Sequence, residues 1–147
     1  MTDRRTFLIA TGSLGLAAAL PAWATPESMR EAVRKIVGDA TVTPGRVSIE
    51  APPLSENGNV VPIAVTVQSP MTPADHVKAI HVFAEKNPDS HVITASLGPR
   101  AGRASLATRI RLADTQTVLA IAQTSDGRFW SGQVNVVVTI SACFEEL

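Results

Sequence analysis

Alternation of apolar and polar residues, which recurs between about residue 46 and residue 140, constrains the fold of this chain more than any other feature. In the clearest run, Val61, Ile63, Val65 and Val67 occupy every second position. Successive side chains of a β-strand point to opposite faces, so this spacing predicts a strand with one apolar face. The pattern therefore predicts a chain made mainly of strands whose apolar faces pack together.

Seven segments carry this pattern, and residues typical of turns separate them. The predicted strands cover residues 46–50, 61–67, 77–84, 91–97, 104–112, 118–124 and 128–140. Asn57-Gly58-Asn59 and Ser125-Asp126-Gly127 have the composition of tight turns. Seven short strands with regular turns predict an immunoglobulin-like antiparallel β-sandwich.

The last predicted strand, residues 128–140, contains a glycine that interrupts the regular pattern. Glycine inside a strand often marks a bulge or a bend. We therefore expect an irregularity near Gly132, with four side chains facing inward: Val134, Val136, Val138 and Ile140.

One helix is expected before the strands, from Pro26 to about Val37. Thr25 suits the N-cap position, Pro26 the first helical position and Gly38 the C′ position. Apolar residues recur three and four positions apart along one face of this helix: Met29, Ala32, Val33, Ile36 and Val37. The apolar stripe needs a partner, which is either the sheet of the same chain or another chain.

Residues 1–24 have the features of an export signal. Arg4 and Arg5 precede an apolar run over residues 8–20, and small residues close the segment at Ala24. Paired arginines followed by x-Phe-Leu resemble the twin-arginine signal, which exports folded proteins. The alternative is a general secretory signal that happens to carry two arginines.

Removal of this signal leaves residues 25–147 as a single β-sandwich domain with a C-terminal cysteine arm. We expect the mature protein in the periplasm without a membrane anchor, because no second apolar segment follows the signal. The sequence contains 13 Lys+Arg and 13 Asp+Glu. This balance argues against a basic surface that binds nucleic acid.

Cys143 is the only cysteine of the sequence and lies close to the C-terminus. In an oxidising compartment a lone cysteine cannot form an internal disulfide, so it is buried, paired with another chain or kept as a reactive thiol. Burial is disfavoured this close to a chain end. A thiol in this position can enter the active site of another protein, as a covalent carrier requires; the alternative is an incidental cysteine that oxidises or dimerises.

The remaining candidates for chemistry have simpler explanations. His76, His81 and His91 lack metal-site spacing, and a Cys–His pair forms only if folding brings one of them to Cys143. Four arginines near the fifth predicted strand are candidates for a cationic surface, with a solvated face as the alternative: Arg100, Arg103, Arg109 and Arg111. We expect neither a cofactor nor a metal ion.

Several blocks of the sequence follow one another in an order shared with a known family. The blocks are Arg4-Arg5, Glu56-Asn57-Gly58, Ser69-Pro70-Met71-Thr72, and residues 77–88, 108–114 and 125–130. Together they resemble the SoxY family of periplasmic sulfur carrier proteins over essentially the whole chain.

The resemblance implies a carrier without enzymatic activity that takes part in thiosulfate oxidation. Cys143 would be the covalent attachment point for sulfur intermediates, within an arm that includes Ser141, Ala142 and Phe144. The resemblance also implies a complex with a SoxZ-like subunit. Further implied partners are a thiosulfate-oxidising cytochrome, a sulfate-releasing hydrolase and a sulfur dehydrogenase.

The C-terminal tail departs from the family pattern. Members typically end in Gly-Gly-Cys-Gly-Gly, whereas this chain ends in Ser-Ala-Cys-Phe-Glu-Glu-Leu. Without glycine the arm is expected to be stiffer, and the carboxylates of Glu145 and Glu146 disfavour the thiolate and repel anionic substrates. Three alternatives follow: a working carrier with an atypical arm, a SoxY-like binding protein with lost or altered carriage, and a structural sandwich that dimerises through Cys143.

Overall fold

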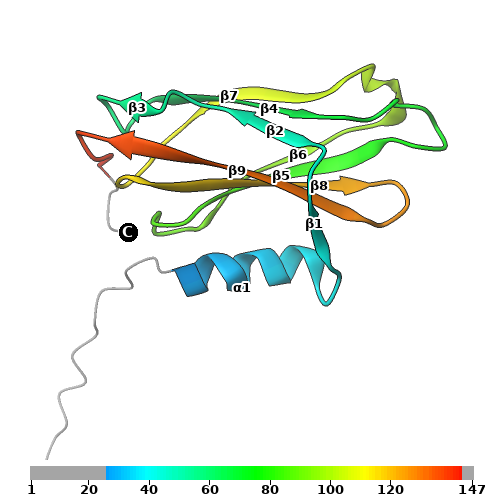
Figure 1. The fold of residues 1–147 in the computed structure, drawn as a ribbon, viewed down its shortest axis with the longest axis horizontal. Helices are drawn as coiled ribbons and strands as arrows, with labels where there is room; N and C mark the ends of the chain where they lie inside the picture. The colour runs from blue at the N-terminus through cyan, green and yellow to red at the C-terminus, as the bar shows by residue number, and fades with distance from the viewer. Residues whose placement is uncertain (1–25, 144–147) are drawn as a thin grey trace, which may run out of the picture.

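A computed structural model describes residues 26–143, which form two packed β-sheets with one α-helix on the outside (Figure 1). The elements in chain order are α1 (Pro26–Val37), β1 (Val42–Pro44), β2 (Val47–Glu50), β3 (Leu54–Ser55), β4 (Val61–Val67), β5 (Val77–Ala84), β6 (His91–Ser96), the 3-10 turn η1 (Pro99–Ala101), β7 (Ala104–Ile110), β8 (Gln116–Thr124) and β9 (Phe129–Val138). The larger sheet has the order β1-β9-β8-β5-β6 with β3 beside β9, and the smaller sheet has the order β2-β4-β7. The predicted immunoglobulin-like sandwich is confirmed.

The alternation in β4 is the reason for the two-sheet arrangement. Val61, Ile63, Val65 and Val67 are at most 3% exposed, and they face the larger sheet from the centre of the smaller one. Full burial of one such side chain contributes about 1.5–3 kcal/mol to folding. The burial of these side chains between the sheets therefore stabilises the sandwich.

Helix α1 packs on the outer face of the larger sheet and forms a third layer (Figure 1). The predicted stripe from Met29 to Val37 lies against Phe83, Ile121 and Phe129. The helix ends at Val37, and the next residue, Gly38, has a φ of 62° that suits glycine and a backbone N–H that donates to the Arg34 carbonyl at 2.8 Å. The partner of the stripe is thus the sheet of the same chain.

Two short strands, β1 and β3, were not predicted, and both run parallel to β9. The larger sheet is therefore mixed rather than purely antiparallel. Segments of two or three residues are too short to show alternation, and their pairing depends on contacts with β9 that are distant in sequence.

The prediction for the last strand is wrong for Ile140, and of the bulge or bend expected near Gly132 the bulge is excluded. The pairing of β8 with β9 continues without a register shift through Gly132, so no bulge occurs there. Glycine is required because the carbonyl of Val47 crosses at this point, and a Cβ on Gly132 would lie 2.3 Å from its oxygen. Ile140 does not face inward but is 64% exposed, because β9 ends at Val138.

No helix within residues 26–143 is long and apolar enough to cross a membrane. The predicted signal residues Arg4 and Arg5, the predicted N-cap Thr25 and the arm residue Phe144 lie outside the described residues.

Candidate functional site

The chain leaves β9 at Val138 and runs beside the loop that joins β3 to β4. The backbone N–H of Val137 donates to the Pro53 carbonyl at 2.9 Å, and that of Thr139 donates to the Ser55 carbonyl at 3.0 Å. The second of these bonds continues the parallel pairing of β3 with β9 one residue past the end of β9. The Thr139 hydroxyl also donates to the Glu56 carbonyl at 3.3 Å, so β3 and the first residue of the loop guide the start of the C-terminal tail.

Gly58 lies where the loop, the tail and the segment after β7 meet. Its N–H donates to the Ile140 carbonyl at 2.7 Å, and its carbonyl accepts from the Leu112 N–H at 2.8 Å. The Leu112 carbonyl in turn accepts from the Ala142 N–H at 3.1 Å. A Cβ on Gly58 would lie 2.5 Å from the Leu112 oxygen and 2.8 Å from the Ala142 nitrogen, so this junction has no room for a side chain.

Cys143 follows directly after this junction. Its thiol is free and exposed, while its backbone N–H donates to Asn59 Oδ1 at 3.1 Å. The Asn59 N–H donates to Asn57 Oδ1 at 2.9 Å, which orders the loop at that point. The structure therefore holds the backbone of the cysteine and leaves its sulfur open to other molecules.

An exposed thiol at the end of a rigid domain has a defined chemistry. As a thiolate it is a nucleophile, and its sulfur forms disulfide-type bonds with other sulfur atoms. The neighbouring arm residues do not cover it, since Ser141 is exposed and Ala142 is only half-buried. Of the open alternatives for Cys143, burial is excluded, and both a reactive thiol and pairing with another chain fit the geometry.

The structure does not place a histidine beside Cys143. Within residues 26–143, no hydrogen bond joins a histidine to its sulfur, whereas the backbone bond to Asn59 is present. His81 and His91 instead lie together, because the Thr94 hydroxyl bonds His81 Nδ1 at 2.9 Å and His91 Nε2 at 2.8 Å. A Cys–His nucleophilic pair is therefore absent from the described part of the chain.

The two histidines lie on the helix-facing side of the larger sheet. His81 is opposite Ile121 in the pairing of β5 with β8, and Ile121 packs under α1. Burial, with a smaller contribution from the charge of His91, lowers the pKa of His81 below its usual value. No group of three or more His, Cys, Asp or Glu side chains among residues 26–143 is arranged to hold a metal ion.

The four arginines do not form one surface. Arg100 lies in η1 and Arg103 precedes β7, whereas Arg111 follows it. At about 3.3 Å per residue, the length of β7 separates the two ends by about 25 Å. Only Arg109 and Arg111 come together, in a groove between β6 and β7 that also contains Asp89 and His91.

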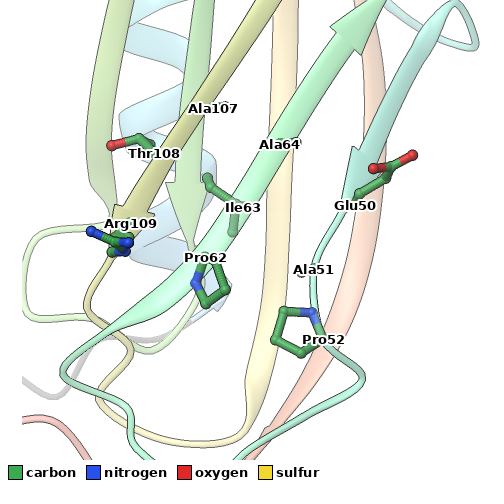
Figure 2. A pocket seen from close by; sticks show the side chains of 9 residues that line it. All are labelled: Glu50, Ala51, Pro52, Pro62, Ile63, Ala64, Ala107, Thr108 and Arg109. Atoms are coloured by element: carbon green, nitrogen blue, oxygen red, sulfur yellow. The ribbon is translucent and has the colours of Figure 1, made fainter.

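A shallow hollow lies on the outer face of the smaller sheet (Figure 2). Glu50 of β2 and Arg109 of β7 lie on opposite sides of it, with Ala64 and Ala107 between them. The hollow exists because small side chains face outward here. Its lining has one hydroxyl group (Thr108), no cysteine or histidine, and a single carboxylate, so Cys143 remains the candidate site.

A family model described as "Sulfur oxidation protein SoxY" matches residues 33–143, which is most of the chain and includes the cysteine. The chain belongs to the SoxY family. Its place among the sulfur oxidation proteins, inferred from blocks of sequence, is thereby confirmed. No curated protein sequence matches it.

Solved structures agree with this SoxY fold. The sulfur carrier protein SoxY from Chlorobium limicola f thiosulfatophilum aligns with a TM-score of 0.66 at 24% identity, over 78% of this chain and 98% of that one. A superoxide reductase (neelaredoxin) from Ignicoccus hospitalis aligns with a TM-score of 0.57 at 15% identity, over 78% of this chain and 92% of that one. A putative superoxide reductase from Thermotoga maritima aligns with a TM-score of 0.53 at 22% identity, over 67% of this chain and 87% of that one. At these identities the likeness is one of fold.

Asn59 and Gly58 are the residues of this site that the sequence did not identify. Asn57-Gly58-Asn59 was predicted as a turn, and Asn57-Gly58 as part of a family block, but neither prediction connected this segment to the cysteine about eighty residues farther along the chain. No short-range pattern connects two segments so far apart.

Proposed function

We propose that this chain is a periplasmic sulfur carrier in thiosulfate oxidation, which holds sulfur intermediates covalently on Cys143 while partner enzymes process them. The observation that carries the proposal is the placement of the thiol. Cys143 is free, exposed and at the end of the family match, beyond the last strand of a rigid sandwich. Such a thiol can enter a partner's active site while its own domain stays outside.

The first chemical step joins thiosulfate to the carrier. The cysteine sulfur forms a bond to the outer sulfur of thiosulfate, the thiol proton passes to solvent, and two electrons pass to a cytochrome acting as the oxidant. The product is a cysteine S-thiosulfonate. In this step Cys143 supplies the attacking sulfur, and the partner supplies the oxidising power.

The second step releases sulfate. Water attacks the terminal sulfonate sulfur, the sulfur–sulfur bond next to it breaks, sulfate leaves, and two protons pass to solvent. A persulfide anion remains on Cys143, and a sulfur dehydrogenase then oxidises its outer sulfur. Hydrolysis and oxidation are assigned to partner proteins, so the carrier contributes the anchor.

Mass spectrometry of the intact protein tests this proposal. The purified chain, in complex with its SoxZ-like subunit, is incubated with thiosulfate and the oxidising components, and a thiosulfonate adduct on Cys143 is expected. The Cys143→Ser variant should stay unmodified. An unmodified cysteine, under conditions that load a family member with a Gly-Gly-Cys-Gly-Gly tail, would contradict the proposal.

A second candidate is a SoxY-like protein that binds its partner but no longer carries sulfur. The tail favours it, because Ser141 and Ala142 replace flexible glycines and the backbone is hydrogen-bonded as far as Cys143. Under this alternative, the complex with the SoxZ-like subunit forms normally. The Cys143→Ser change would then leave growth on thiosulfate unaffected, whereas a working carrier would lose it.

Export through the twin-arginine pathway completes the proposal. It rests on Arg4 and Arg5 and the apolar run that follows them. Export of a folded protein would also allow a partner without its own signal to travel in a preformed complex. Replacing both arginines with lysine should keep the chain in the cytoplasm, as cell fractionation would report; continued export would indicate a general secretory signal.

A further inference from the structure

We infer that Asn59 is a positioning residue for Cys143, whose side chain holds the cysteine backbone against the sandwich so that the thiol is presented from a fixed point. The inference rests on the proposed role of Cys143 as the sulfur anchor. It assigns a function to a loop residue that is distant in sequence from the cysteine.

The geometry of the contact is specific. Asn59 Oδ1 accepts the backbone N–H of Cys143 at 3.1 Å, so the bond leaves the sulfur unengaged. Asn59 is itself held by the bond from its N–H to Asn57 Oδ1. The Ser55 hydroxyl donates to the Asn57 carbonyl at 3.0 Å, which ties the same loop to β3. Contacts within the loop therefore hold Asn59 Oδ1, the acceptor of the Cys143 N–H, in place independently of the tail.

This bond is the last in a series along the tail of the described chain. The N–H groups of Val137, Thr139 and Ala142 donate to backbone carbonyls, and the Ile140 carbonyl accepts from Gly58. At Cys143 the acceptor is a side chain instead. The terminal contact can thus be removed by one substitution without altering the backbone bonds before it.

Among residues 26–143, little apolar burial supports this contact, since Ala142 is only half-buried. Ile140, Ser141 and Cys143 are all exposed, so little burial opposes opening of the tail. At Cys143 itself a single hydrogen bond, the one to Asn59, sets the balance between the held and released states, and its loss should raise the released population of this residue about threefold to tenfold. Asn59 would thus orient the thiol in a tail that lacks the glycines typical of the SoxY family.

The single cysteine makes a direct experiment possible, because a nitroxide spin label attaches only at Cys143. Electron paramagnetic resonance of the labelled full-length protein reports the mobility of the tail. Three variants are compared with the unaltered chain: Asn59→Ala, which removes the acceptor; Asn59→Asp, which keeps it; and Asn135→Ala. Asn135 is an exposed side chain of β9 that accepts from the Thr117 hydroxyl, and it serves as the matched control.

The expected result is a mobile component that increases about threefold to tenfold in Asn59→Ala and stays near the original level in the other two variants. Equal spectra for Asn59→Ala and the unaltered chain would overturn the inference. If Asn59→Ala fails to fold, hydrogen exchange of the Cys143 amide in the unaltered chain decides the matter, since an amide without protection contradicts the bond.

The outcome is independent of sulfur loading. A spectrum that changes as expected while Cys143 takes up no sulfur would retain the positioning role and reject the proposed carrier. An unchanged spectrum with normal loading would reject Asn59 alone.

Discussion

Strand β9 and the tail that follows it are held in two different ways. Val136 and Val138 are 0% and 7% exposed and pack in the core between the sheets, whereas Ile140, two residues farther, is 64% exposed. Both segments have hydrogen-bonded backbones. The strand therefore has both burial and hydrogen bonds, whereas residues 139–143 have hydrogen bonds with little burial.

This difference places the boundary between stable and releasable structure at the end of β9. Local opening is least costly where few buried apolar contacts are lost, so the tail can open without the sandwich. A sulfur carrier needs both properties: a domain that stays folded at the partner's surface and a thiol that can move into its site. Substitutions in the sandwich and in the tail both test this difference.

The largest effect is expected in the core beneath the tail. Leu112 is fully buried, although its carbonyl bonds the tail residue Ala142. Leu112→Ala should lower the free energy of unfolding by about 2–5 kcal/mol because it leaves a cavity. Urea denaturation measures the change. The matched variant Leu54→Ala, at a side chain 51% exposed, should stay within about 0.5 kcal/mol; equal losses in the two variants would contradict the proposed boundary.

A smaller loss is expected at Gly132, where the backbone of β2 lies close against that of β9. Gly132→Ala would place a Cβ 2.3 Å from the Val47 carbonyl oxygen, and such overpacking costs about 1–3 kcal/mol. Gly98→Ala is the control, because nothing lies within 4 Å of its Cβ position and its φ of −119° suits any residue. The thermal unfolding temperature should fall in Gly132→Ala and not in Gly98→Ala. An unchanged temperature for Gly132→Ala would mean that the two sheets move apart to accommodate the added Cβ.

The free energy of unfolding should depend on pH through His81, which lies on the helix-facing side of the larger sheet. Burial lowers the pKa of His81 below the value of about 6.5 for the unfolded chain, so the unfolded state binds the proton more readily. Stability is then fully present above pH 6.5 and falls as the pH drops through the lowered pKa of the folded state. His81→Leu should flatten this part of the profile, as denaturation between pH 7.5 and 5 would report. Identical slopes for both proteins would contradict the assignment to His81.

The smallest effect is expected in the tail. Ile140→Ala should change the free energy of unfolding by less than about 0.5 kcal/mol, because the side chain is largely in solvent. The same substitution at Ile110, which is 4% exposed at the end of β7, should cost about 2–5 kcal/mol. A large loss at Ile140 would show that the tail is part of the core after all, or that another surface covers it.

Local patterns in the sequence were sufficient to predict most of the sandwich. Alternation in β4 identified its buried face, and the apolar stripe of α1 identified the side that packs. The thiol at Cys143 was predicted from position and composition, and its exposure agrees. These features depend on residues a few positions apart, so short-range periodicity determines them.

The errors have a common cause in contacts between distant segments. Gly132 was interpreted as the site of a bulge or bend, but the close approach of Val47 explains the glycine. Ile140 continues the alternation of β9 past the point where the opposite sheet ends. The bond between Asn59 and Cys143 likewise joins segments that only the assembled fold brings together.

The proposed sulfur anchor is tested most directly by the intact mass of the carrier after turnover. The complex with its SoxZ-like subunit is incubated with thiosulfate and the oxidising partner proteins, and Cys143 is mapped by peptide mass spectrometry. We expect a thiosulfonate or persulfide adduct on Cys143 that a reducing agent removes and that Cys143→Ser lacks. A mass that stays unchanged, while a family member with a glycine-rich tail is loaded in the same mixture, would contradict sulfur carriage by this chain.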